Sequence, residues 1–124
     1  MKHVYSETLL DHFRNPRNVG ELPCPPAIVS SVENPVCGDT LRLYARVEDG
    51  RIAEVRYQVR GCTASIATAS AFTELLQGMT RAEVKALRAE DAEAAIGGLE
   101  AESKHAAVLC VQAAKVLLLG WVTR

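Results

Sequence analysis

The chain has 124 residues, of which 48% are hydrophobic and 23% charged, and its formal net charge is −1. This composition is typical of one folded domain, so residues 1–124 are expected to form a single domain. The near-neutral charge and the lack of a basic stripe among aromatic residues argue against nucleic-acid binding. The most apolar window, residues 106–122, contains Gln112 and Lys115 and is shorter than a membrane span. A buried core helix, not a membrane segment, is expected there.

Four cysteines, Cys24, Cys37, Cys62 and Cys110, are spread along the chain. Their density is low for a disulfide scaffold, and the N-terminus lacks the apolar run of a secretory signal. Reduced thiols and a cytoplasmic location are therefore the expectation.

The first helix is predicted over residues 6–14. Ser6 is a suitable N-cap, and Leu9, Leu10 and Phe13 lie at helical spacing, so they should form the buried stripe. Pro16 ends this helix, because the residue before a proline avoids the helical region.

Three strands are predicted to follow. Residues 27–32 indicate a short strand, and residues 40–47 and 52–60 indicate two longer strands in which apolar and polar side chains alternate. Asp49-Gly50 lies between the longer strands and is a strong signal for a two-residue hairpin turn.

Helices are predicted for the rest of the chain, over residues 64–77, 80–87, 91–96 and 103–120. Thr63 or Ser65 can cap the first of these helices, and Gly78 ends it. Ser103 is the expected N-cap of the last helix.

The predicted hairpin brings two cysteines together. It places Asp39 opposite roughly Arg60, so Cys37 and Cys62 should meet just beyond the paired strands. Cys62 would then lie at a helix N-terminus, where the dipole and the free N–H groups favour the thiolate that binds metals. Two thiols and a carboxylate suit zinc, iron or an iron–sulfur cluster. A structural thiol pair or a disulfide explains the same spacing, and the spacing alone does not decide between them.

Further candidates lie beside these residues and at the start of the last helix. Gly38 and Gly61 let the backbone approach a bulky group beside each thiol. His105 is the candidate fourth ligand, and Lys104 would stabilise anionic sulfur. Cys110 lies about 140° round the helix from His105, so the two side chains do not share a face. A solvated histidine and a core cysteine are the ordinary alternatives.

Three blocks of the sequence carry a resemblance to a known family: residues 5–20, with Asp11-His12-Phe13-Arg14-Asn15-Pro16; Asn34-Pro35-Val36-Cys37-Gly38-Asp39; and Gly61-Cys62 followed by residues 64–70. In these blocks and their spacing, the chain resembles the IscU/NifU N-terminal type of iron–sulfur cluster assembly scaffold. The resemblance implies an α+β fold, in which a small three-stranded antiparallel sheet packs against about four to five helices. The site is expected at one end of the sheet.

The same resemblance implies a scaffold or carrier with no catalytic residue, and it leaves a role as a sulfur-transfer partner open. Such a scaffold receives sulfur from a cysteine desulfurase, binds iron, holds a [2Fe–2S] cluster transiently and passes it to acceptor apo-proteins. The implied ligands of the iron or cluster are Cys37, Asp39, Cys62 and His105, supported by Gly38, Gly61 and Lys104. Zinc is an alternative occupant of these ligands in the isolated protein.

The sequence departs from the family pattern in three respects. Ala106 stands where the family has its third cysteine, and Cys110 follows about 40° further round the helix and roughly 6 Å along it, so it is a candidate replacement. Residues 100–104 replace the Leu-Pro-Pro-Val-Lys stretch that family members present to a dedicated chaperone, so delivery by that chaperone is in doubt. The insertion of zinc-dependent, SufU-type relatives is also missing.

Three functional hypotheses follow. The first is a scaffold that assembles a cluster on Cys37, Asp39, Cys62 and His105. The second is a zinc-binding sulfur acceptor that works with a desulfurase. The third is a degenerate member that lacks the third cysteine and regulates a partner by protein contact.

Overall fold

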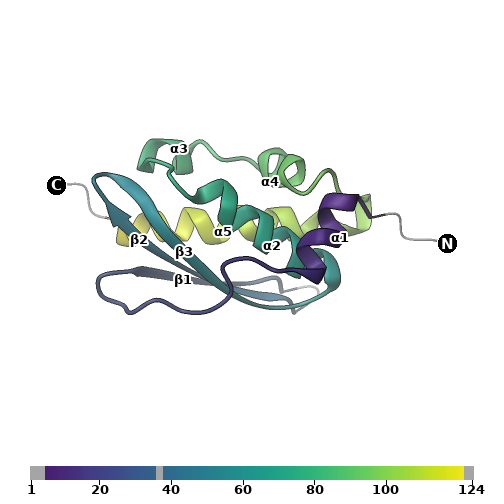
Figure 1. Cartoon of the computed structure of the whole chain (residues 1–124), viewed down its shortest axis with the longest axis horizontal. Coiled ribbons are helices and arrows are strands. Elements are labelled where there is room, and N and C mark those ends of the chain that lie inside the picture. Colours follow the sequence, from purple (N-terminus) through teal and green to yellow (C-terminus); the bar gives the residue numbers. More distant parts are fainter. Residues whose placement is uncertain (1–4, 36–37, 122–124) are drawn as a thin grey trace.

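The computed structural model describes residues 5–35 and 38–121, so Cys37 falls outside the described residues. The elements in chain order are α1 (Glu7–Arg14), β1 (Ile28–Glu33), β2 (Thr40–Glu48), β3 (Arg51–Arg60), α2 (Thr63–Leu76), α3 (Arg81–Lys85), α4 (Ala89–Ala95), η1 (Ala101–Ser103) and α5 (His105–Gly120). The strands form one antiparallel sheet in the order β1-β2-β3. Figure 1 shows α2 and α5 between this sheet and the outer helices α3 and α4. The described residues thus have the predicted α+β fold.

The turn between β2 and β3 has the predicted conformation. Asp49 and Gly50 both have a positive φ, of 53° and 75°, as a two-residue hairpin turn requires. A β-bulge between Arg46 and Val47 then shifts the register of the two strands by one residue. The sequence carries a signal of this bulge, because Ile52 is buried three residues before Val55, out of phase with the alternation of Val55, Tyr57 and Val59.

The bulge changes what lies at the open end of the hairpin. Thr40 pairs with Arg60, whereas the predicted register placed Asp39 opposite that arginine. The prediction is therefore off by one residue. Asp39 instead lies beside Gly61. The shift brings Asp39 one position nearer to Cys62, the residue that follows Gly61.

Helix α1 begins after Ser6 as predicted, and the Ser6 hydroxyl accepts the Leu9 N–H at 3.0 Å. Its buried face differs from the prediction, because Leu9 is buried but Phe13 is 40% exposed. His12 is buried instead of Phe13. A polar side chain can take that position because Ser70 and Glu74 of α2 supply partners for its ring nitrogens.

Two helix starts also differ from the prediction. The N-cap of α2 is Cys62 and not Thr63 or Ser65, so the helix begins one residue after the cysteine. At the last helix, Ser103 belongs to the 3-10 turn η1, and Lys104 precedes α5 as its N-cap. The extra turn brings His105 to the first position of α5.

Helix α5 is the predicted core helix. It packs against β1 and β2, and its buried side chains are Ala106, Ala107, Leu109, Cys110, Ala113, Ala114 and Leu117. The helical stretch Ala101–Gly120, within the residues described, passes a test for membrane crossing by length and apolar composition alone. A buried core helix passes the same test, and α5 is such a helix.

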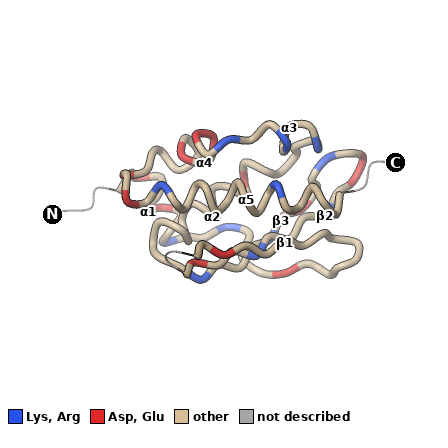
Figure 2. The backbone as a smooth tube through the Cα atoms, turned by 180° about the vertical axis from the view of Figure 1, so that it is seen from behind, with Lys and Arg blue, Asp and Glu red and all other residues tan. Residues whose placement is uncertain are grey.

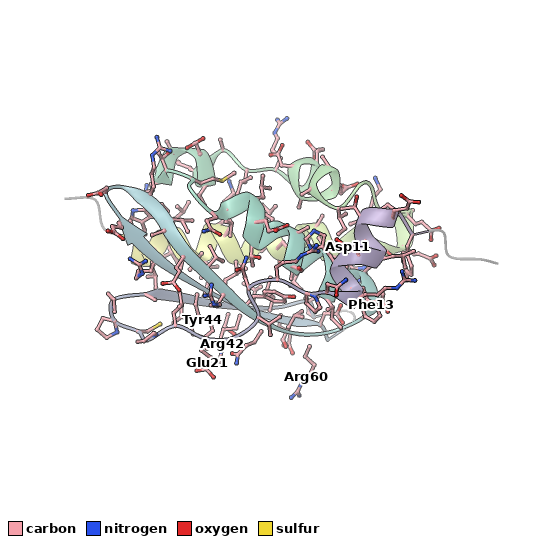
Figure 3. All side chains as sticks on the ribbon, viewed as in Figure 1. Asp11, Phe13, Glu21, Arg42, Tyr44 and Arg60 are labelled. Atoms are coloured by element: carbon pink, nitrogen blue, oxygen red, sulfur yellow. The ribbon has the colours of Figure 1, made fainter. Side chains whose placement is uncertain are left out.

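The sheet face opposite the helices is polar. Figure 3 shows Arg42 and Arg60 extending from this face, away from the helices. Figure 2 shows basic and acidic residues interspersed along the described backbone. The apolar core accordingly lies on the other face of the sheet, under α2 and α5.

Candidate metal centre

Three segments each bring one metal-binding side chain to the same end of the molecule. Asp39 immediately precedes β2, Cys62 follows β3 as the N-cap of α2, and His105 is the first residue of α5. Figure 1 shows the starts of α2 and α5 at the end of the molecule where α1 also lies. One ligand atom of each residue lies within 4.8 Å of the other two. The fourth predicted ligand, Cys37, lies outside the described residues.

The ring of His105 is oriented by the backbone. Its Nδ1 lies 3.1 Å from the carbonyl oxygen of Glu102, and a carbonyl only accepts, so Nδ1 carries the hydrogen and donates. In the neutral ring, Nε2 then has a free lone pair. That atom lies 3.8 Å from Sγ of Cys62 and 3.5 Å from Oδ2 of Asp39. Histidine ligands of metals are commonly held by such a second bond.

The carboxylate of Asp39 is buried against α2. The residue is 9% exposed, and its Oδ2 accepts a 2.7 Å hydrogen bond from the Ser65 hydroxyl. Gly61 makes room for it, because a Cβ at that position would lie 2.8 Å from both Cγ and Oδ2 of Asp39. Any larger residue at position 61 would displace the carboxylate. The sequence predicts that this glycine lets the backbone approach a bulky group beside the thiol; what the structure shows is a close approach to the carboxylate of Asp39.

Gly38 has a different role from Gly61. Its φ is 78°, a backbone conformation that other residues rarely adopt, and a Cβ there would meet no atom within 4 Å. Gly38 therefore shapes the backbone that leads into Asp39, whereas Gly61 provides space.

Ser65 belongs to the site, although the sequence indicated it only as an alternative helix cap. It lies at the third position of α2, where a side chain reaches back towards the N-cap residue, and its Oγ lies 3.4 Å from Sγ of Cys62. The three-residue spacing from Cys62 is the signal that could have identified it.

The three described cysteines have different environments. Cys62 is exposed at the site, and Cys24 is exposed in a loop, where its thiol bonds to the Leu22 carbonyl oxygen at 3.4 Å. Cys110 is 1% exposed within the core under the sheet, and burial raises the pKa of its thiol to about 12. It remains protonated at neutral pH. The structure therefore places the candidate replacement thiol among apolar side chains and not with the ligands.

The other predicted residues of the last helix also point elsewhere. The Nζ of Lys104 lies 3.1 Å from Oε1 of Glu93 on α4, so this lysine forms an ion pair with the outer helix layer. Ala106 is 1% exposed and belongs to the buried face of α5. Position 106 therefore supplies no third thiol to the site formed by Cys62 and His105.

A second cluster of polar side chains lies between α1 and α2. Nδ1 of His12 lies 2.7 Å from the hydroxyl of Ser70, which also accepts the Arg17 backbone N–H at 2.9 Å. Nε2 of His12 lies 3.3 Å from Oε1 of Glu74. These four residues are called the α1–α2 seam below. Burial, and then the charge of Arg17, lower the pKa of His12 below its ordinary value.

The chain was compared with families and with individual proteins. The family model for the NifU-like N terminal domain matches residues 4–123. The chain belongs to the NifU-like N-terminal domain family. The resemblance inferred from the three sequence blocks is thereby confirmed, and the match extends over nearly the whole chain.

Individual relatives agree with this assignment. The chain is 39% identical over 118 residues to the iron-sulfur cluster assembly scaffold protein IscU 1 of Archaeoglobus fulgidus, a match that covers 95% of this chain and 76% of that protein. It is 39% identical over 115 residues to the nitrogen fixation protein NifU of Cereibacter sphaeroides, covering 93% of this chain and 46% of that protein.

A solved structure shows the same fold. It is a putative iron-sulfur cluster assembly scaffold protein for the SUF system from Fervidobacterium islandicum, with a TM-score of 0.71 and 21% sequence identity. The superposition covers 92% of this chain and 96% of that chain. Within this NifU-like domain, the adjoining ends of β2, β3, η1 and α5 form a frame for one thiol, one imidazole and one carboxylate.

Proposed function

We propose that this NifU-like domain is an iron–sulfur cluster assembly scaffold that receives sulfur from a cysteine desulfurase, binds iron and releases a [2Fe–2S] cluster to acceptor proteins. One observation carries the proposal: the ligand atoms of Asp39, Cys62 and His105 lie within 4.8 Å of one another at an end of the molecule. Relatives with the same domain are named as assembly scaffolds. Cys37 is proposed as the fourth ligand.

The arrangement suits a cation because three potential ligand atoms converge there. Nε2 of His105 lies 3.8 Å from Sγ of Cys62 and 3.5 Å from Oδ2 of Asp39, so one ion could contact all three. Thiolate and imidazole are preferred ligands of iron, and a carboxylate completes the set.

Cys62 is also proposed as a sulfur acceptor, because its thiol is exposed. Its thiolate would attack the outer sulfur of a persulfide on the desulfurase. One S–S bond forms as the donor's S–S bond breaks, and the donor cysteine leaves as a thiolate. The exchange consumes no external oxidant or reductant.

The test is anaerobic reconstitution of the purified protein with ferric iron and sulfide, which already have the oxidation states of an oxidised [2Fe–2S] cluster. We expect visible sulfur-to-iron charge-transfer absorption, which Cys62→Ser abolishes. Cys24→Ser is the matched control and should retain the absorption, since that thiol lies in a separate loop. The scaffold proposal is wrong if the wild-type protein develops no such absorption, or if both variants lose it equally.

The ligand types also favour a second candidate, a zinc-binding sulfur acceptor that works with a desulfurase. One sulfur, one nitrogen and one oxygen ligand, with a fourth from Cys37, would make a tetrahedral zinc site. Metal analysis of the protein as purified and a sulfur-uptake assay with a desulfurase separate this candidate from the first. It fails if zinc is absent and Cys37→Ser leaves sulfur uptake intact.

A further inference from the structure

Ser65 touches two of the proposed ligands at once. Its Oγ lies 2.7 Å from Oδ2 of Asp39 and 3.4 Å from Sγ of Cys62, and the residue is 2% exposed. A hydroxyl has one proton to donate and a carboxylate only accepts, so that proton points to Asp39. The bond is held in place by α2, since Ser65 lies in the first turn of that helix.

The oxygen that accepts this bond is the one that faces the rest of the site. Oδ2 of Asp39 lies 3.5 Å from Nε2 of His105, and Gly61 presents no side chain against the carboxylate. A carboxylate that rotates about its Cβ–Cγ bond exchanges its two oxygens, and a hydrogen bond to one of them opposes that rotation. The hydrogen bond from Ser65 therefore decides which oxygen is turned towards Cys62 and His105.

We infer that Ser65 is a positioning residue, which fixes Asp39 as an oxygen ligand towards the metal held by Cys62 and His105. The inference rests on the proposed metal-binding function. It assigns Ser65 no contact with the metal, because its effect passes through Asp39. Residues that hold a ligand in this way typically change metal affinity by about 10–100-fold when they are removed.

The experiment is a titration of the full chain with Co²⁺ under anaerobic conditions, followed by visible absorption. Co²⁺ reports the thiolate through a charge-transfer band and the coordination geometry through its ligand-field bands. We expect Ser65→Ala to weaken Co²⁺ binding by about 10–100-fold and to change the ligand-field bands. The sulfur band from Cys62 should persist in this variant.

A double-mutant cycle identifies the route of the effect. If Ser65 acts through Asp39, Ser65→Ala should cost nothing further in an Asp39→Ala background. Ser65→Thr retains the hydroxyl and should bind within about threefold of the wild type. Ser70→Ala is the matched control on the same helix: it removes the seam serine and should leave Co²⁺ binding unchanged while lowering the urea midpoint.

The inference is overturned if folded Ser65→Ala has the affinity and spectrum of the wild type. It is also overturned if Ser65→Ala costs the same in both backgrounds, or if folded Ser65→Thr binds as weakly as Ser65→Ala. In these cases the wild-type protein still binds metal and the proposed function stands. If the wild type itself shows no sulfur-to-cobalt band, the proposed function fails together with the inference.

Discussion

Helix α2 carries two serines five residues apart, and each belongs to a polar cluster that includes a histidine from another element. In the α1–α2 seam, Ser70 bonds to His12, and the ring of His12 reaches Glu74 on its other side. At the metal centre, Ser65 bonds to Asp39, which lies beside His105. The chemical groups are nearly the same, but the two clusters differ in how those groups are arranged.

The polar groups of the seam pair with one another across two helices. Ser70 accepts the Arg17 N–H and can donate its own proton to Nδ1 of His12, while Nε2–H of that ring points to Glu74. These contacts join α1 and the segment after it to α2. At the metal centre, the ligand atoms of Asp39, Cys62 and His105 instead face one another, and Ser65 bonds to Asp39 beside them. The comparison teaches that the convergence of potential ligand atoms on one point, more than the residue types, distinguishes a binding site from a structural polar cluster.

The largest effect is expected in the seam. His12→Ala should lower the free energy of unfolding by about 3 kcal/mol, because it leaves a cavity and a buried Ser70 hydroxyl with one partner fewer. Urea unfolding measures this loss, and Co²⁺ titration of the same variant should match the wild type. Unchanged stability would show that the seam does not hold α1 on α2.

The reverse result is expected at the metal centre. His105→Ala should weaken Co²⁺ or Fe²⁺ binding by about 100-fold, equivalent to about 2.7 kcal/mol, because it removes a ligand that Glu102 holds in place. Its urea midpoint should stay near that of the wild type, since the His105 side chain is 29% exposed. If His105→Ala binds metal as tightly as His12→Ala does, the distinction between the two clusters is wrong.

A smaller effect is expected for the core thiol. Cys110→Ser should destabilise the protein by about 1–2 kcal/mol, because burying a hydroxyl among apolar side chains costs more free energy than burying a thiol there. Metal stoichiometry should not change. In the native protein, alkylation should modify Cys62 and Cys24 well before Cys110, whose pKa of about 12 and 1% exposure remove the reactive thiolate. Alkylation of Cys110 at the rate of Cys62 would contradict its placement in the core.

Much of the frame could be predicted from local patterns. The alternation along β2 and β3, the Asp49-Gly50 turn and the Ser6 cap each depend on a few neighbouring residues, and each prediction is confirmed. The convergence of Asp39, Cys62 and His105 followed from the hairpin and the family pattern, and the structure brings the three residues together.

The features that the sequence did not reveal depend on contacts between distant elements. The bulge at Arg46 and Val47 shifts Asp39 towards Gly61, and its only mark in the sequence is the phase change between Ile52 and Val55 in β3. The burial of His12 in place of Phe13 requires partners on α2, which helical periodicity cannot supply. The role of Ser65 likewise appears only once Asp39 is placed against the helix.

The smallest expected effect is a pH dependence that belongs to the seam, because protonating His12 removes no atom from it. The pKa of His12 in the folded protein lies below the ordinary 6.5, chiefly because the ring is buried and then because Arg17 is near, while Glu74 and Asp11 oppose the shift. As the pH falls below about 6.5, the unfolded chain takes up this proton before the folded chain does. This contribution to stability is therefore complete above that pH and declines below it, down to the folded-state pKa.

Urea unfolding of the wild type between about pH 7.5 and pH 5.5 should show the decline, and His12→Ala should lack this component. If the unfolding free energies of the two proteins change in parallel with pH, His12 takes up its proton equally in the folded and unfolded states. The seam would then accommodate a charged ring as readily as a neutral one.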